Sequence, residues 1–456
     1  MSENKNHSNI NIVTGDPKVA IRKLSWPMMI SMLLIMAYNL ADSIWVAGLG
    51  PDALSALGFI TPLFLIMVGL GNGLGAGANS LIARAIGAKD KKLADNAALH
   101  SILITIIISI ILPIILLFLL EDMLIVMGAA NTTPLALAYG NIVFLGMFPF
   151  LFSSVAASIL RSEGDVKRAM YAMVITAVFN VILDPIFIYI LNLGVEGAAY
   201  ATLISSILSC LVMIYWLFIK KDTYISLLPK NFNYSVPILK DIISVALPAS
   251  IEQLILSFIS VLLNAILAMV ASTVAVGVFV AGWRLIMMGA IPFMGIGTAV
   301  VTVAGASYGA QNWDKLKLTF NYSTQLGLVI GVTLTILFWI FAPQLALLFG
   351  YSSESAQLTP QIANLLRVMA FFFLCLPLGI NASSVFQGVG KGLYSLICTI
   401  LREVIFILLT VYVLAFIFLF GEQGVWWGFI SGAFIGSLVA YIWCKLFISK
   451  LEKKNL

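Results

Sequence analysis

Two aspartates, Asp42 and Asp184, lie within long apolar stretches of the sequence. A carboxylate at membrane depth is costly unless it is protonated, paired or bound to a cation, so such acids mark places where ions or substrates move. Asn180 precedes Asp184 by one helical turn on the same face, and Thr202 reaches a similar depth on the next stretch. Together these groups form an oxygen-rich set that suits a hard monovalent cation or a shared proton.

Each acid also has a purely structural explanation. Asp42 lies near the outer end of its stretch, where headgroup water can solvate it, and Asp184 directly precedes Pro185, where it can cap a helix end. Two acids at one depth, together with Asn180 on the same helix face as Asp184, favour an ion site over these separate explanations.

The composition defines the elements that must position these side chains. Of 456 residues, 61% are hydrophobic and 10% are charged, and the mean hydropathy is +1.06, which excludes an ordinary soluble protein. Apolar runs long enough to cross a hydrocarbon core of about 30 Å recur about twelve times. We expect an all-α integral membrane protein with spans at residues 24–48, 54–81, 94–120, 135–160, 168–191, 195–219, 241–269, 275–304, 319–342, 358–386, 394–419 and 424–448.

Charge placement predicts the topology of these spans. Counted from a cytoplasmic N-terminus, alternate turns carry lysine and arginine, whereas the opposite loops carry only acids. The positive-inside rule then places both termini in the cytoplasm, with the spans in the plasma (inner) membrane. The net charge of +5 belongs to the inner membrane face and not to a nucleic-acid site. The basic turns include Arg84, Lys89, Lys167, Arg168, Lys230, Lys315, Lys391 and Arg402, and the opposite acids include Asp52, Glu121, Asp122, Glu196 and Glu422.

The chain also contains an internal repeat. Its anchors are Gly73-Leu74-Gly75 with Gly295-Ile296-Gly297 at a shift of 222, Ser158 to Arg161 with Ser384 to Gln387 at 226, and Gly197 to Tyr200 with Gly424 to Trp427 at 227. Six spans per half is an even number, so the halves form a parallel repeat, related by a pseudo-two-fold axis along the membrane normal. We expect cytoplasmic tails at 1–23 and 449–456, six-helix lobes at 24–220 and 241–448, and a cytoplasmic linker at 221–240.

Two such lobes leave a central cleft that rocking motions open alternately to either side, which is the architecture of a transporter. A carrier is favoured over a channel because no stretch resembles a filter of backbone carbonyls. Flexible apolar and weakly polar groups would line the cleft and repack around varied ligands. Candidates near the acids are Met32, Met36, Tyr38, Ser153, Ser154, Met173 and Thr176, although each such residue more often serves in packing.

Glu252 is a further acid, near the middle of the seventh span. It either neutralises a cationic substrate in the cleft or pairs with Arg284 or Arg367 in the second half. The salt bridge is the favoured alternative.

Other chemistry finds little support. The run Gly388–Gly392 lacks the spacing and the hydroxyl residue of a nucleotide-binding loop. Gly69, Gly73 and Gly77 at intervals of four indicate close helix packing or local bending. With two histidines, and with all four cysteines inside spans, neither a metal cluster nor a nucleophile triad can be assembled. We expect neither an enzyme nor a bound cofactor.

Three segments together resemble the multidrug and toxic compound extrusion (MATE) transporters, and are most similar to the archaeal, DinF-like branch. They are Tyr38-Asn39-Leu40-Ala41-Asp42 with Gly48, Phe179 to Pro185, and Gly194 to Thr202. The resemblance covers essentially the whole chain. It implies that Na⁺ or H⁺ drives export, and that this ion is held by Asp42, Asn180, Asp184 and Thr202, with the carbonyl of Ala198 as a weaker candidate.

The resemblance has two further implications. The first span should bend at a proline, and Pro27 stands at the matching place, although a proline in a first turn can simply begin a helix. Another branch of the family uses a glutamate on the seventh span and an aspartate on the tenth. This chain has Glu252 but an apolar stretch at 371–377, which leaves the coupling ion open.

The sequence therefore predicts a secondary active multidrug exporter that exchanges amphipathic, cationic organic compounds for Na⁺ or H⁺ by alternating access. We expect a single chain in the lipid bilayer to be sufficient. The alternative is a flippase for a lipid or lipid-linked oligosaccharide from the same broad superfamily, which would present a cationic cleft to a pyrophosphate. The acids of the first half favour the exporter.

Overall fold

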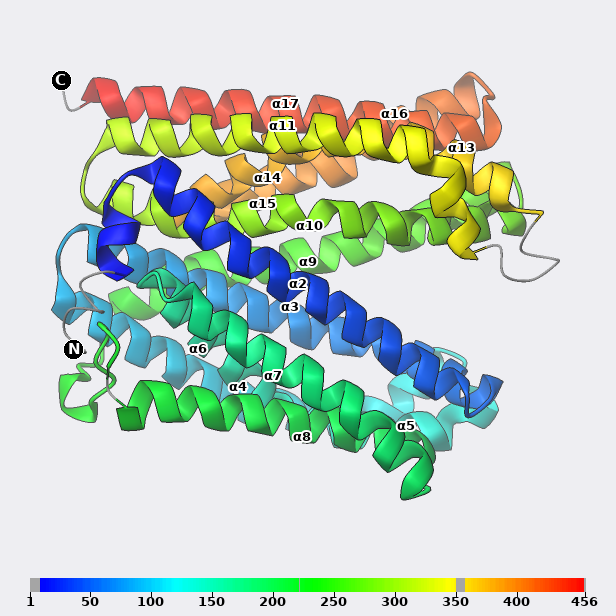
Figure 1. The fold of residues 1–456 in the computed structure, drawn as a ribbon, viewed down its shortest axis with the longest axis horizontal. Coiled ribbons are helices and arrows are strands. Elements are labelled where there is room, and N and C mark those ends of the chain that lie inside the picture. The colour runs from blue at the N-terminus through cyan, green and yellow to red at the C-terminus, as the bar shows by residue number, and fades with distance from the viewer. Residues whose placement is uncertain (1–8, 221, 350–356, 455–456) are drawn as a thin grey trace. The chain divides into compact units, whose positions relative to one another are not determined.

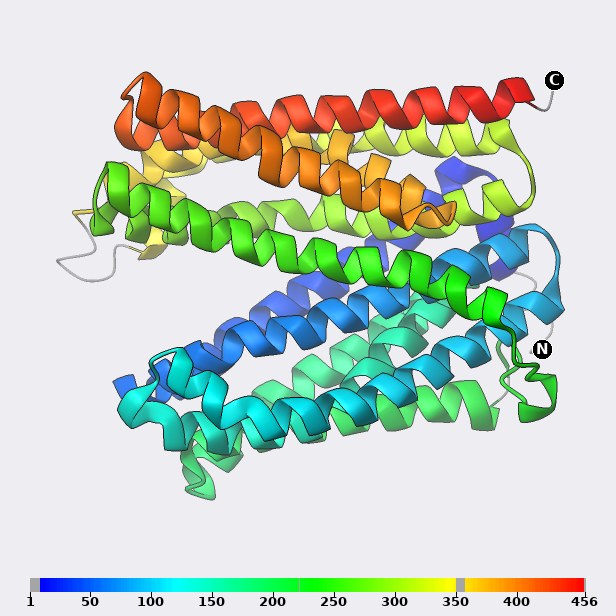
Figure 2. The ribbon, with the colours of Figure 1, turned by 180° about the vertical axis from the view of Figure 1, so that it is seen from behind.

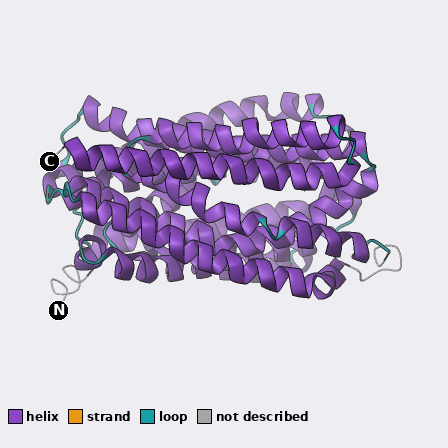
Figure 3. Cartoon of the chain, turned by 90° about the horizontal axis from the view of Figure 1, so that it is seen from above, coloured by secondary structure: helices purple, strands orange, loops and turns teal. Residues whose placement is uncertain are grey.

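The computed structural model describes residues 9–220, 222–349 and 357–454, and within these ranges the regular structure is entirely helical (Figure 3). Residues 1–8 and 455–456 of the predicted tails and residue 221 of the predicted linker lie outside the described part. Among the described residues, ten helices are long and apolar enough to cross a membrane, and two bent helix pairs raise the number to twelve if each pair is one span. The predicted all-α membrane fold is thereby confirmed.

The helices divide into two compact units, which we describe separately. The described residues of the first lie within Met1–Gly15 and Trp26–Ser250, and those of the second lie within Asp16–Ser25 and Ile251–Leu456. Two of the three divisions fall inside helices, one after Ser25 in the first span and one after Ser250 in the seventh.

Among the described residues, the first unit is built from the greater part of one long helix, six complete α-helices and the first part of another (Figures 1 and 2). Helix α3 packs on α4 and α6, and α7 packs on α8. The elements are α2 Pro17–Ala47, α3 Pro51–Gly87, α4 Lys91–Val126, η1 Ala130–Thr132, α5 Thr133–Leu145, α6 Met147–Ser162, α7 Val166–Pro185 with the π-helix η2 Ile186–Ile190, α8 Gly194–Ile214 with the π-helix η3 Tyr215–Lys220, η4 Pro229–Asn231, and the start of α9 Val236–Val270.

The second unit is also built from long apolar helices, of which α14 packs on α10, α11 and α17. Its core is a cluster of buried residues that includes Phe293, Phe373 and Trp426. The elements are the start of α2 up to Ser25, the rest of α9, α10 Thr273–Gly309, α11 Trp313–Ala346, η5 Leu347–Phe349, α13 Thr359–Met369, α14 Phe372–Gly388, α15 Gly392–Thr399, the π-helix η6 Ile400–Phe406, α16 Ile407–Tyr412, the π-helix η7 Val413–Ile417, and α17 Gly421–Lys454.

The backbone repeats between the halves at the same shifts as the sequence. Asp90 accepts a hydrogen bond from the third amide of α4, and Asn312 does the same for α11, 222 residues later. Three pairs of equivalent residues share a left-handed backbone. They are Lys89 (φ 60°) with Gln311 (53°), Gly164 (88°) with Gly390 (79°), and Asn192 (54°) with Leu419 (56°). The bent pairs α5–α6 and α13–α14 also correspond, with bends of 46° and 45°. One helical plan is therefore used twice.

Glycines allow α9 to approach α3 closely within the first unit, which confirms the packing role predicted for Gly73 and Gly77. A Cβ on Gly73 would lie 2.5 Å from the Ala246 carbonyl oxygen, and one on Gly77 would lie 2.5 Å from that of Ile242. Both obstacles are backbone atoms, so only glycine fits at this crossing.

The described part of the linker is held against the first unit by side chains of α4 and of the α6–α7 turn. The Ile225 amide donates to Glu163 over 3.1 Å, and the Ser226 amide donates to Asp95 over 2.8 Å. The Asn233 amide donates to Asn96 over 3.1 Å, and the Ser235 amide donates to His100 Nε2 over 3.0 Å. The start of α9 is fixed to α3 by a two-pronged pair between Arg84 and Asp241, with nitrogen–oxygen distances of 2.8 and 3.2 Å. The described part of the linker is therefore held as part of the first unit.

Candidate ion site

Helices α7 and α8 bring three of the predicted side chains together inside the first unit. Asn180 and Asp184 stand one turn apart on α7 and are 1% and 0% exposed. The Asn180 amide donates to the Thr202 hydroxyl of α8 over 3.2 Å. Ala198, one turn before Thr202, is fully buried on the same helix.

Helix α2 contributes the second carboxylate. Asp42 is partly buried near the end of α2, and it lies close enough to Asp184 for the two acids to interact electrostatically. The two acids therefore lie near one another within the first unit.

Two tyrosines complete the surroundings of the acids. Tyr38, one turn before Asp42 on α2, and Tyr139 on α5 both lie within electrostatic range of Asp42 and Asp184. Sequence reasoning placed Tyr38 in the substrate cleft and missed Tyr139. The available signal was a tyrosine near the outer end of the fourth span, at the depth of Asp42.

Unused acceptors distinguish this site chemically. Oδ1 of Asp42, Oδ1 of Asn180 and both carboxylate oxygens of Asp184 are buried and receive no hydrogen bond from the described residues. Buried polar atoms are nearly always satisfied in proteins, so four such oxygens in one site call for an explanation. Such oxygens accept hydrogen bonds from donors and also bind protons and cations, so the residues present are suitable for Na⁺ or for a shared proton.

The predicted substrate residues are distributed over three helices of the first unit. Met32, Met36 and Tyr38 lie on α2, Ser153 and Ser154 on α6, and Met173 and Thr176 on α7, all partly buried. The Thr176 hydroxyl donates to the Ala172 carbonyl over 3.2 Å, whereas the buried Ser153 hydroxyl has no partner among the described residues. Only Tyr38 of this set is brought to the acids by a described interaction.

The position of Pro27 differs from one sequence expectation. Helix α2 begins at Pro17, so the buried Pro27 lies in its interior and not in its first turn. An interior proline removes a backbone hydrogen bond and favours a kink, so the explanation that Pro27 merely begins the helix is wrong.

Glu252 belongs to the second unit, where its surroundings differ from those predicted. The Gln387 amide donates to Glu252 over 3.3 Å, and the ion pairs of the described residues do not include this acid. Arg284 is exposed, and Arg367 stacks over the Trp339 ring at 5.6 Å. The predicted salt bridge with either arginine is therefore wrong.

Arg402 requires a related correction. The sequence assigned it to a cytoplasmic turn, but it lies within the candidate span Gly392–Ile417 and is only 8% exposed. Its Nε donates to the buried Glu403 carboxylate over 2.7 Å within the π-helix η6. Sequence reasoning missed this pair because two adjacent opposite charges resemble a loop end.

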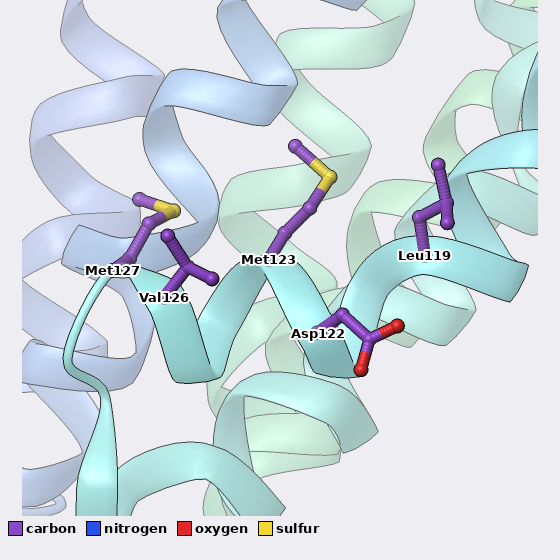
Figure 4. Close-up of a pocket in the computed structure, with 5 residues that line it drawn as sticks. All are labelled: Leu119, Asp122, Met123, Val126 and Met127. Carbon is purple, nitrogen blue, oxygen red and sulfur yellow. The ribbon is translucent and has the colours of Figure 1, made fainter.

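A surface groove near the end of α4 lies apart from these residues. It has a volume of about 280 Å³ and is lined by Leu119, Asp122, Met123, Val126 and Met127 (Figure 4). Leu119 and Met123 point to one side of the helix and Asp122 to another, so this shallow groove offers no convergent polar groups.

The fold and the acid site define a polytopic α-helical membrane protein of the transporter class. Residues 27–186 and 248–413 match the MatE family model. The multidrug export protein MepA of Staphylococcus aureus is 26% identical over 426 residues, which are 93% of this chain and 92% of that protein.

Two solved structures are similar over nearly the whole chain at 40% identity. One is a MATE protein in complex with MaL6, with a TM-score of 0.96, covering 98% of this chain and 99% of the other. The second, a MOP superfamily transporter from Pyrococcus furiosus, has a TM-score of 0.94 and covers 97% and 98%. The chain therefore belongs to the MatE family of multidrug and toxic compound extrusion transporters, and the predicted family is confirmed. This is a family of transporters and not of enzymes.

Proposed function

We propose that this protein is a secondary active exporter that exchanges amphipathic, cationic organic compounds for Na⁺ or H⁺. The observation that carries the proposal is the set of buried acceptor oxygens on Asp42, Asn180 and Asp184, which receive no hydrogen bond from described residues. Membership in the family and the similarity to a multidrug export protein support the export of organic compounds.

The ion acts by stabilising one arrangement of the first unit. Two carboxylates in one buried site repel each other, and a bound Na⁺ or proton removes that repulsion. Pro27 in the interior of α2 provides a place where the helix that carries Asp42 changes its bend. Alternating access follows if the ion and the substrate prefer different arrangements, because each shifts the equilibrium only by its differential affinity.

We further propose that both termini lie on the cytoplasmic side of the plasma membrane. Lysine and arginine on alternate turns support this orientation. One chain carries the complete acid site in its first unit, so we propose that a monomer is sufficient for coupling.

Export should be measured as efflux of a fluorescent organic cation from proteoliposomes, with Na⁺ and pH gradients imposed separately. We expect Asp42→Asn and Asp184→Asn to lower gradient-driven efflux at least about tenfold, since each removes one charge from the ion site. The matched control is Asp52→Asn, which changes an exposed aspartate in the first turn of α3. Normal coupled efflux by both site variants would contradict the proposal.

A lipid flippase is the second candidate. For the MOP superfamily transporter from Pyrococcus furiosus, which is 40% identical to this chain, the reverse polarity of the binding pocket suggests a different function. Transbilayer movement of a labelled pyrophosphate lipid, with no efflux of organic cations under either gradient, would favour this alternative.

A further inference from the structure

The π-helix that follows Asp184 touches the end of the helix that carries Asp42. Tyr189 lies in η2, and its hydroxyl donates to the Trp45 backbone carbonyl over 2.5 Å. The two rings meet edge to face, with centroids 6.2 Å apart and an interplanar angle of 70°. We call this contact between Tyr189 and the end of α2 the outer clasp.

The end of α2 is shaped to receive the tyrosine hydroxyl. The first amides after α2 donate hydrogen bonds to carbonyls three residues earlier. The Gly48 amide donates to the Trp45 carbonyl over 3.2 Å, and the Leu49 amide donates to the Val46 carbonyl over 2.9 Å. The Trp45 carbonyl has two lone pairs, so it accepts from both the Gly48 amide and the Tyr189 hydroxyl. A Cβ on Gly48 would collide with the Tyr189 hydroxyl oxygen, whereas the Cζ atom of that ring would remain at 3.4 Å.

The outer clasp lies directly beyond the acid site on both helices. Trp45 follows Asp42 by three residues, and Tyr189 follows Asp184 by five. The first separation corresponds to a rise of about 4.5 Å along α2. The clasp therefore joins two helices immediately next to the point where their carboxylates interact.

The internal repeat provides a comparison within the same chain. At the shift of 227, Tyr189 corresponds to Phe416, which has no hydroxyl, and Asp184 corresponds to Val411. The second half therefore lacks both the acid and the tyrosine hydroxyl on this helix. Because the acid and the hydroxyl are absent together while the backbone is shared, we associate the outer clasp with the ion site and not with the fold common to both halves.

We propose that Tyr189 is a positioning residue of the ion site, and that its hydroxyl holds the end of α2 so that Asp42 faces Asp184. The inference rests on the proposed ion coupling. It assigns Tyr189 no contact with the ion itself. Removing the hydroxyl should weaken ion binding and leave transport at saturating ion concentration close to normal.

Tyr189→Phe tests this role because it removes only the hydroxyl and introduces the residue of the second half. We expect the ion concentration for half-maximal efflux to rise about three- to tenfold, the range that follows from the net worth of one hydrogen bond. The same shift should appear in the ion concentration that raises the melting temperature of the purified protein half-maximally. Tyr200→Phe is the control, since it removes an exposed tyrosine hydroxyl from neighbouring α8.

Gly48→Ala provides a second, independent variant. Alone, its methyl group should displace the Tyr189 hydroxyl and reproduce the ion-affinity loss of Tyr189→Phe. In the Tyr189→Phe background it should add less than about a twofold change, because the ring carbon at 3.4 Å leaves room for the methyl group. This non-additivity would not arise from two unrelated structural defects.

The outcomes separate the clasp from the function on which it rests. If the wild type depends on the ion but Tyr189→Phe keeps the wild-type ion affinity, the clasp has no positioning role and the exporter proposal stands. Fully additive losses from Gly48→Ala and Tyr189→Phe would overturn the clasp as well. If the wild type shows neither ion-driven efflux nor ion-dependent stabilisation, both proposals fail.

Discussion

Glu163 provides a quantitative prediction about pH. It follows α6 directly, is 3% exposed, and accepts the linker amide of Ile225 over 3.1 Å. Burial raises the pKa of Glu163 from 4.5 to about 8, and nearby Asp165 adds to the rise. The hydrogen bond from Ile225 and the charge of Arg168 oppose this shift without cancelling it.

The sign of the effect follows from the raised pKa. The folded state holds the proton on Glu163 more tightly than the unfolded chain, so its contribution to stability is complete below about pH 4.5. That contribution declines as the pH rises towards about 8, by up to about 5 kcal/mol at 1.36 kcal/mol per pH unit. About 2 kcal/mol of the loss should fall between pH 6 and pH 8.

Thermal unfolding in detergent measures this effect directly. Glu163→Gln keeps a neutral acceptor for the Ile225 amide and does not titrate, so its melting temperature relative to wild type should rise by a few °C between about pH 6 and pH 8. Glu196→Gln changes an exposed acid on α8 and should follow the wild-type profile. A constant difference between Glu163→Gln and wild type across this range would refute the reasoning.

Two further predictions concern packing and buried charge. Gly73→Ala should lower stability by about 1–3 kcal/mol, because the new methyl group would lie 2.5 Å from the Ala246 carbonyl oxygen. Gly58→Ala, with nothing within 4 Å of the added carbon, should leave the melting temperature unchanged or slightly higher. Glu403→Gln should cost about 3–5 kcal/mol, since it leaves the buried Arg402 guanidinium without its charged partner, and melting curves of the purified variants would measure each loss.

The sequence predicted the fold because a membrane allows few solutions. Apolar runs of spanning length must be helical in lipid, so composition and run length identified the spans at 135–160 and 358–386, which the structure forms as bent helix pairs. The repeat was also readable, because Gly164 and Gly390 occupy turns whose left-handed backbone favours glycine.

The site was only partly predictable for a related reason. Asp42, Asn180 and Asp184 stand out because polar atoms in an apolar run need a partner. Tyr139 did not stand out, since tyrosine is common near membrane interfaces and its proximity to the acids depends on how α5 packs. Arg402 with Glu403 was missed because burial of a neutralised pair depends on tertiary packing.

Comparison of the two halves explains why the acid site occurs once. At the shift of 227, Asn180, Asp184 and Thr202 correspond to Ile407, Val411 and Phe429. These three apolar residues are 0–2% exposed and belong to the core cluster of the second unit. The same backbone plan therefore buries hydrocarbon in one half and unsatisfied oxygens in the other. Apolar residues at these positions are sufficient for packing in the second unit. The polar residues at the same positions of the first unit therefore support an ion-binding role for it.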